Sequence, residues 1–108
     1  MTGAIDPGQL RHRYVIESEI ETADGLGGST VQWTKQFDVW AQIKPVSARL
    51  VTNAGATMPE ISHIFIIRYR DDVMPGMRFV NAGNQFLIDA TYDPDLTGRY
   101  LKCETRQV

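Results

Sequence analysis

The segment ISHIFIIRYR, from Ile61 to Arg70, decides the fold class. Its apolar residues fall on both sides of an extended chain, and four of them are consecutive between Ile64 and Ile67. This pattern is typical of a central strand buried on both faces. A membrane span needs about 20 apolar residues, so the segment is too short to cross a bilayer. We therefore predict a core β-strand here.

A period of two extends the β prediction toward the N-terminus. The segment from His12 to Thr22 has two unlike sides, as in a half-buried strand: Tyr14, Ile16, Ser18 and Ile20 against Arg13, Val15, Glu17, Glu19 and Glu21. Glycines and an Asp-Gly pair in residues 23–29 then predict a hairpin, because glycine supplies the positive φ of tight turns. Two extended pieces follow, at 30–37 and 39–46, and Pro45 should end the ladder or lie at an edge.

Turn-forming segments divide the C-terminal part into short strands. They are DDVMPG at 71–76, NAGN at 81–84 and DPDLTG at 93–98. The predicted strands are 77–80, a strand within 84–92 with Phe86, Ile88, Ala90 and Tyr92 inward, and 99–106. Six to seven short strands without sustained helical periodicity predict an all-β fold, a small β-barrel or sandwich.

Residues 46–60 follow neither the period of two of a strand nor the period of a helix. They are mostly small and polar, and we expect one long loop with room for a short helix between Ala48 and Ala54, which Asn53 and Gly55 stop early. A loop of this length is uncommon in so small a domain and is often functional. The sequence therefore predicts a working element rather than a simple connector.

Composition predicts one folded domain spanning residues 1–108. The chain is 43% hydrophobic and 22% charged, close to the globular average. Its net charge of −2 lacks the basic character of proteins that hold nucleic acid tightly through phosphates. The opening MTGAIDPGQL has no signal-peptide features, and a single cysteine excludes an internal disulfide, which fits a reducing cytoplasm.

Catalytic or metal-binding machinery is not predicted. The two histidines, His12 and His63, lie in no recognisable motif, and we expect a solvated His12 and a packed His63. One cysteine and two distant histidines offer no metal-ligand spacing. The Asp pairs at 71–72 and 93–95 fall in turns, where Asp commonly bonds its own backbone. We predict no catalytic residue, no metal and no cofactor.

Charge patterning suggests a contact between subunits. Glu17, Glu19 and Glu21 share one strand face, which is either a solvated face or an acidic docking surface. Basic residues lie on segments that could be neighbours: Arg68, Arg70, Arg78, Arg99, Lys102 and Arg106. Our hypothesis is that the acidic row meets basic residues of an adjacent subunit.

Several short motifs together resemble a known family. They are GQLRHR at 8–13, DGLGG at 24–28, VWAQIKP at 39–45 after Trp33, SHIFIIRYR at 62–70, GMRF at 76–79, QFLI at 85–88 and RYLKCE at 99–104. Each motif alone is weak, but their order and near-full coverage are specific. The chain resembles the head-tail joining proteins of tailed phages, also called head completion or head closure proteins, which occur in gene transfer agents too.

The resemblance implies a small β-barrel that forms a ring between the portal-associated adaptor and the tail. Such a ring retains packaged double-stranded DNA without binding it specifically and gives the tail its attachment surface. The expected location is a virion or virion-like particle assembled in the bacterial cytoplasm, with no membrane partner. By position, the channel-facing loop contains Ser47, Arg49, Thr52, Asn53, Gly55 and Thr57. Leu50 departs from the family pattern, which has an acidic residue after Arg49.

Two other functions compete with this one. A tail completion or tail terminator protein is also a small β-rich ring subunit. A nucleic-acid-binding small barrel would stack bases on Trp33, Trp40 and Phe65. The acidic net charge and the position of these aromatics in expected core strands disfavour the second alternative. An enzyme is the least supported function.

Overall fold

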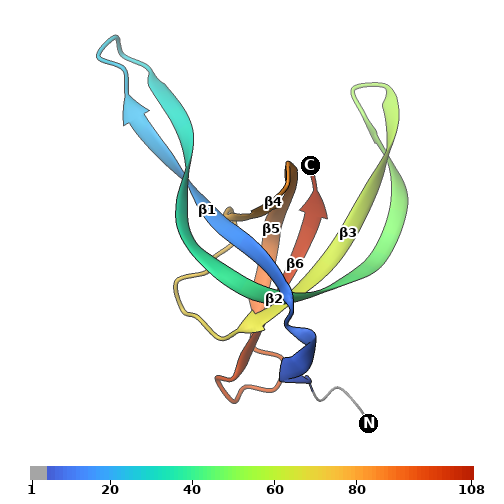
Figure 1. Ribbon diagram of the computed structural model, residues 1–108. Coiled ribbons are helices and arrows are strands. Elements are labelled where there is room, and N and C mark those ends of the chain that lie inside the picture. Colours follow the sequence, from blue (N-terminus) through green and yellow to red (C-terminus); the bar gives the residue numbers. More distant parts are fainter. Residues whose placement is uncertain (1–4) are drawn as a thin grey trace.

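The computed structural model describes residues 5–108 and, for residues 47–49, 51, 53, 58, 59 and 61, the backbone alone. A single 3-10 turn, η1 (Pro7–Gln9), precedes six strands. They are β1 (His12–Ala23), β2 (Ser29–Asn53), β3 (Ala56–Arg68), β4 (Arg78–Asn81), β5 (Asn84–Tyr92) and β6 (Tyr100–Gln107). Their order is β1-β2-β3-β6-β5-β4, all neighbours are antiparallel, and β4 pairs with β1 to close a barrel (Figure 1). The predicted all-β fold is confirmed, in its barrel form.

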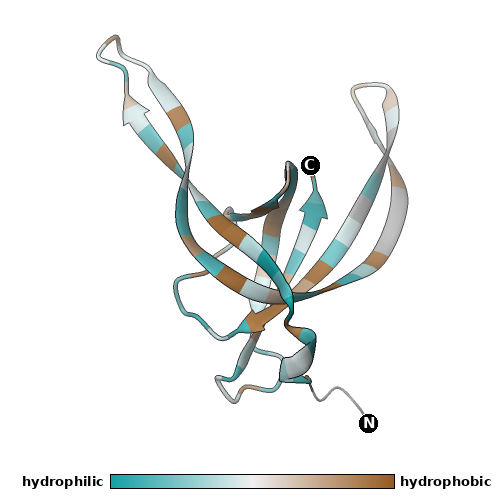
Figure 2. Ribbon diagram, viewed as in Figure 1, coloured by the Kyte–Doolittle hydropathy of each residue, from teal (hydrophilic) through white to brown (hydrophobic). Residues whose placement is uncertain are grey.

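Aromatic rings fill the barrel. Phe65 and Phe79 are fully buried and stack with their ring centroids 4.1 Å apart. Tyr14 meets Phe65 edge-on at 5.0 Å, and Phe86 lies 5.1 Å from Phe65. Brown and teal residues alternate along the barrel strands in Figure 2, as expected where every second side chain faces the core. Each aromatic pair adds about 0.5–1.5 kcal/mol beyond the area that it buries.

The predicted core strand is buried on both faces, as its sequence indicated. Phe65 and Ile67 belong to the barrel core, whereas Ile66 between them faces outward and is still only 1% exposed. Ile66 lines a shallow cavity together with Ile5 and Gln9. The N-terminal segment therefore covers the outer face of β3 and accounts for its continuous apolar run.

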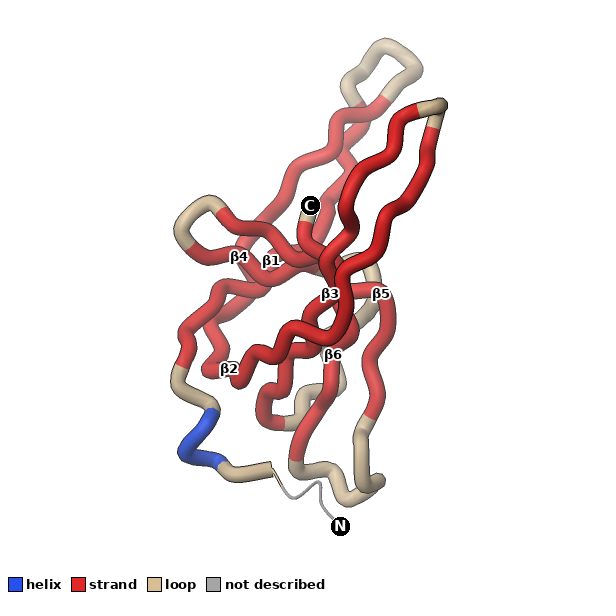
Figure 3. The backbone as a smooth tube through the Cα atoms, turned by 90° about the vertical axis from the view of Figure 1, so that its right-hand side faces the viewer, coloured by secondary structure: helices blue, strands red, loops and turns tan. Residues whose placement is uncertain are grey.

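Two ribbons extend beyond the barrel. β1 pairs with β4 only at residues 15–17, and β3 pairs with β6 only at residues 62–68, so the remaining residues of β1 and β3 pair with β2 alone. We call residues 18–34 the first arm and residues 47–61 the second arm. Both arms project from the same end of the barrel (Figures 1 and 3). They raise the radius of gyration to 15.8 Å, whereas a compact chain of this length has about 13 Å.

The prediction of a long loop at 46–60 is wrong, and so is the short helix within it. The backbone pairs regularly from Ser47 with Ser62 to Asn53 with Ala56. Only Ala54 and Gly55 form the connection, with φ of 53° and 80°. Two consecutive positive φ values are the signature of the tightest hairpin turns. The segment is therefore a β-hairpin arm.

Bulges explain why β2 is one strand where two pieces were predicted. Gln36 lies between the paired residues Lys35 and Phe37, and Val46 lies between Pro45 and Ser47, without partners in the ladder. A bulge bends a strand without ending it. Pro45 does not end the ladder; it lies where β2 pairs with β3 alone, so the predicted edge position is confirmed.

The C-terminal turns and strands agree with the sequence, with one exception. β4, β5 and β6 begin within one residue of the predicted positions, and Phe86 and Ile88 are buried. The register shifts between Ile88 and Ala90, so the alternation breaks there and Tyr92 is exposed. The inward position predicted for Tyr92 is wrong. None of the described residues forms a helix able to span a membrane.

Candidate interaction surfaces

The six predicted channel residues all fall on the second arm: Ser47, Arg49, Thr52, Asn53, Gly55 and Thr57. Thr52 and Thr57 form a directly opposed pair whose hydroxyl oxygens are 3.2 Å apart. Gly55 lies in the turn at the tip. The side chains of Ser47, Arg49 and Asn53 lie outside the described residues. The structure thus places this set on a hydrogen-bonded ribbon instead of a loop.

The second arm has no net charge. It contains one arginine and one glutamate, Arg49 and Glu60, and the two are opposed in the β2–β3 register. Leu50 and Val46 are large apolar residues exposed on or beside this arm. An exposed, neutral and partly apolar ribbon is better suited to contact protein than to hold phosphate groups.

The first arm is acidic throughout. It contains Glu19, Glu21 and Asp24 and has no lysine or arginine. The Asp24 carboxylate accepts hydrogen bonds from the backbone N–H groups of Leu26 and Gly28 at 2.7 and 3.1 Å, which fixes the turn at the tip. Leu26 is 90% exposed there. The arm therefore presents three negative charges and three exposed apolar side chains, Ile20, Leu26 and Val31, of which Leu26 is the most exposed.

Glu17 does not belong to this exposed set, although it shares a strand face with Glu19 and Glu21. Its carboxylate accepts from Arg78 Nε and lies 2.8 Å from Nη2 of the same guanidinium, and the two side chains are 20% and 16% exposed. The guanidinium also lies 4.1 Å from the centroid of Trp33 and donates to Gln85. We call Glu17, Trp33 and Arg78 the clamp. It joins the base of the first arm to β4 and β5.

The predicted basic set is divided by the fold. Arg70 donates to Asp72 through two nitrogens at 2.9 Å, lies over the Phe37 ring at 3.7 Å, and holds the pKa of the Asp72 carboxyl below its usual value. Arg106 pairs with Asp89 at 3.1 Å. Two arginines already have acidic partners in their own chain, in addition to the one in the clamp.

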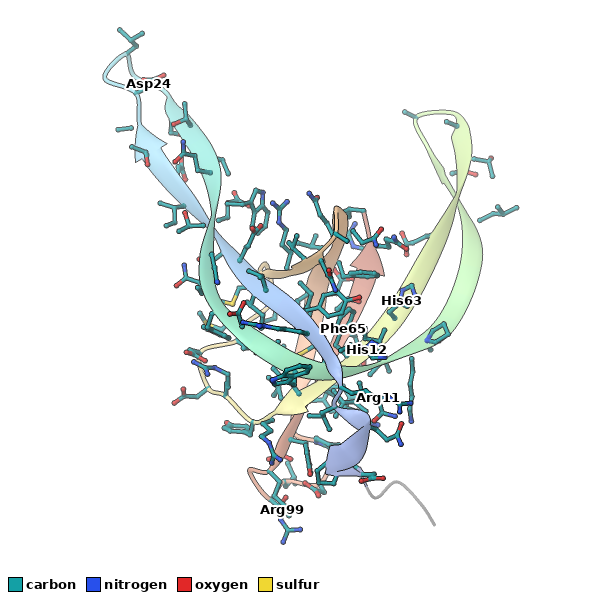
Figure 4. The ribbon with its side chains drawn as sticks, in the orientation of Figure 1. Arg11, His12, Asp24, His63, Phe65 and Arg99 are labelled. Atoms are coloured by element: carbon teal, nitrogen blue, oxygen red, sulfur yellow. The ribbon has the colours of Figure 1, made fainter. Side chains whose placement is uncertain are left out.

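The remaining three basic residues are Arg68, Arg99 and Lys102. Arg68 and Arg99 lie close together, because Arg68 pairs with Tyr100, next to Arg99, at the end of the barrel opposite the arms (Figures 1 and 4). Lys102 lies beside the N-terminal segment. Of the segments that carry the basic residues, β3 and β6 are neighbours as predicted, but the basic residues are spread along them.

A different basic surface was missed by sequence reasoning. It is a groove at the base of β1, which we call the basic groove. Its polar and aromatic lining consists of Arg11, His12, Arg13, Tyr14, Lys35, Asp38, Trp40 and Asn81. Arg13 lies 2.8 Å and Lys35 3.4 Å from the Asp38 carboxylate. The hydrogen bond from Arg13 is the main cause that lowers the pKa of Asp38. Val39 and Ala41 occupy the core, so Trp40 between them faces outward and is 57% exposed. The alternation of the strand sequence could have shown this outward position.

The two groups with reactive potential, Cys103 and His63, are packed against other side chains. Cys103 is fully buried, and burial raises the pKa of its thiol to about 12. The His63 ring is half-buried and meets Phe86 edge-on at 5.1 Å, as expected of a packed histidine. No group of three potential metal ligands occurs among the residues that the structure describes.

Comparison with known proteins identifies the family. The family model described as phage head completion protein matches residues 5–108. The chain belongs to the phage head completion protein family. A chain in the solved structure titled "Virion of native gene transfer agent (GTA) particle" is similar, with a TM-score of 0.78 and 26% identity over 91% of this chain and 94% of that chain. The comparison with curated proteins found no match for this chain.

Membership confirms the resemblance drawn from the sequence motifs. A head completion protein is a structural component of the virion, so the expected location is confirmed as well. The family is not an enzyme class. In this head completion protein, Phe65 is fully buried and cannot stack a base, and Arg78 covers one face of the Trp33 ring.

Proposed function

We propose that this chain is the head-closure connector of a phage or gene transfer agent. Copies of the chain form a ring between the portal-associated adaptor and the tail. The ring retains the packaged DNA and gives the tail its attachment surface. Its role is mechanical and involves neither catalysis nor a cofactor.

The observation that carries this proposal is the pair of arms. An isolated two-stranded hairpin is marginally stable in water, because it buries little apolar surface. Its outer edges also expose backbone N–H and C=O groups that readily pair with another chain. Leu26 on the first arm and Leu50 on the second are exposed as well. Ribbons of this kind gain stability when neighbouring subunits cover them, as in a ring.

The second arm has the properties that a channel-facing element needs. Its two charges are opposite and its tip consists of Ala54 and Gly55 flanked by small residues. DNA is held mainly through phosphates by lysine and arginine. A neutral arm on a chain with a net charge of −2 lets DNA pass without adhering. A ribbon is also a stiffer barrier than the loop that the sequence suggested.

A tail completion or terminator ring remains the second candidate, since exposed arms suit any ring subunit. The family match favours head completion. The nucleic-acid-binding module loses support, because Phe65 is enclosed by the core and the one well-exposed tryptophan, Trp40, lies beside a carboxylate.

The test is a particle whose connector lacks the second arm. Replacing residues 48–61 by Asn-Gly leaves Ser47 and Ser62 opposed across a two-residue turn that Asn-Gly favours. Because residues 48–61 pair only within the arm, the barrel should fold normally. We expect particles that still contain the chain but whose DNA becomes accessible to nuclease. Full DNA protection in such particles would contradict the channel role.

Deletion of the whole gene tests the broader proposal. We expect heads that lack tails or lose DNA, whereas normal tailed particles would contradict it. A third outcome would separate the two claims: gene deletion abolishes normal tailed particles, but the arm variant still gives tailed particles that keep their DNA. They would leave the connector role in place and remove the role of the arm.

A further inference from the structure

Charge is distributed unevenly along β1. Most of the basic groove lies at its first residues, whereas Glu19 and Glu21 lie further along the strand and Asp24 lies in the turn that follows it. Figure 4 shows Arg11 and His12 near the base of β1 and Asp24 at the far tip of the arm. Twelve strand residues separate the two ends, a distance of about 35 Å at roughly 3.3 Å per residue.

The basic groove is suited to an acidic protein segment. Arg11, Arg13 and Lys35 provide three positive charges, and Asp38 is the single carboxylate of the lining, which leaves a net charge of +2. Arg13 and Lys35 are more than half exposed although both contact Asp38. Exposed Trp40 adds a large apolar surface beside them. Tryptophan and arginine are the residues most enriched at the energetic centres of protein interfaces.

The tip of the first arm has the complementary composition. No ion pair in the described part of the chain involves Glu19, Glu21 or Asp24, so the first arm keeps its charge of −3, and Glu21 and Asp24 lie nearest its tip. Leu26 projects from the turn with 90% exposure. Exposed Leu26 beside Asp24 on an acidic arm therefore complements exposed Trp40 in a groove of net positive charge.

We propose that the tip of the first arm of one copy seats in the basic groove of the next copy. Within one chain Leu26 and Asp24 at the tip cannot reach Arg11 and His12 in the groove, because they lie at opposite ends of the β1–β2 ribbon. Two different patches that bind each other make a heterologous contact, which passes from copy to copy and closes a ring when the rotation allows. This inference rests on the proposed ring and assigns the surfaces that hold it together.

The clamp supports the geometry. Glu17 and Arg78 hold the base of the first arm against β4, so the arm leaves the barrel in a defined direction. A defined direction reduces the conformational entropy that is lost when the tip binds. The charges are exposed, so the contact should weaken as salt concentration rises.

Thiol cross-linking tests the contact directly. The full chain carrying Leu26→Cys and His12→Cys is assembled into particles and treated with a short bismaleimide. Native Cys103 is fully buried and should not react with the bismaleimide. We expect a ladder of covalent trimers and larger species. The control pair, Leu96→Cys with His12→Cys, uses an equally exposed residue in the 93–98 turn and should give no ladder.

Charge exchange tests the chemistry of the contact. Glu19→Lys with Glu21→Lys reverses the tip, and Arg11→Glu with Lys35→Glu reverses the groove while leaving Arg13 and Asp38 paired. Each reversal alone should lower the ladder yield by about tenfold or more, because like charges then face each other. The two reversals combined should restore it.

The outcomes separate this inference from the proposed function. If wild-type particles hold the chain at the neck and the Leu26→Cys/His12→Cys pair gives no ladder, the tip-to-groove contact is wrong and the connector role stands. A ladder that stops at dimers also overturns the contact, since it would indicate a reciprocal pair. Absence of the chain from the neck defeats the proposed function itself. A groove reversal that lowers DNA binding and leaves the ladder intact would reassign the groove to nucleic acid.

Discussion

Removal of Arg78 should destabilise the protein far more than removal of an ordinary surface arginine. Its guanidinium contacts the Glu17 carboxylate at 2.8 Å and the Trp33 ring at 4.1 Å, with 16% and 20% exposure of the two charged side chains. Breaking a buried ion pair costs about 3–5 kcal/mol and an exposed one under about 1 kcal/mol. A cation–π contact adds about 0.5–2 kcal/mol. For Arg78→Met, which keeps an apolar stem, we expect a loss of about 2–3 kcal/mol and a Tm lower by about 10–15 °C.

Urea unfolding followed by circular dichroism and tryptophan fluorescence measures this loss. The matched control is Arg106→Met, because Arg106 and Asp89 pair at 3.1 Å but are 42% and 46% exposed, and its cost should stay under about 1 kcal/mol. A double-mutant cycle with Glu17→Gln should give a coupling of about 1–2 kcal/mol. Equal costs for Arg78→Met and Arg106→Met, or a coupling near zero, would refute the clamp.

Three further predictions concern the core, the second arm and the thiol. Phe65→Ala should cost about 3–5 kcal/mol in urea unfolding, since the ring is fully buried; a loss under about 1 kcal/mol would contradict the assigned core. Gly55→Val places a β-branched residue at a φ of 80° and should speed amide exchange in the second arm, while the barrel amides remain protected; unchanged exchange in the arm would argue against the turn. Cys103, with a pKa raised to about 12 by burial, should be almost entirely protonated at pH 8 and resist a thiol reagent until the chain is unfolded; rapid labelling of the native protein would contradict its burial.

The barrel was predictable because its strands are patterned by the core. Alternation places Ile16 inward on β1, the continuous apolar run marks β3, and glycine and aspartate mark the turns. These signals arise wherever one face of a strand must be buried. Even the second buried face of β3 was correctly indicated, although the segment that covers Ile66 was not identified in advance.

The arms were not predictable by the same reasoning. The backbone of the second arm extends beyond the barrel and pairs with no other strand, and residues 47–61 do not alternate in hydropathy, so they were interpreted as a loop. The bulge at Val46 also interrupts the pattern near Pro45, where a break was expected. The signal that remained was the unusual length of the segment, which correctly marked an element beyond the compact fold.

The candidate surfaces were only partly predictable for a related reason. The sequence identified the acidic row, but it could not show that Glu17 is neutralised by Arg78, 61 residues away. Nor could it show that Arg70 and Arg106 already have acidic partners in their own chain. The basic groove needed the closed barrel, which brings the β1 base, β2 and the β4–β5 turn together.

The most direct test of the account is a cryo-EM reconstruction of the neck of the phage or gene transfer agent particle that is assembled with this chain. We predict a closed ring of the chain between the portal-associated adaptor and the tail. The second arms should point toward the channel axis, and the first arms should reach the basic grooves of neighbouring copies. A neck without this chain, or a ring whose arms both point outward into solvent, would contradict the claim that the arms are the assembly elements of this connector.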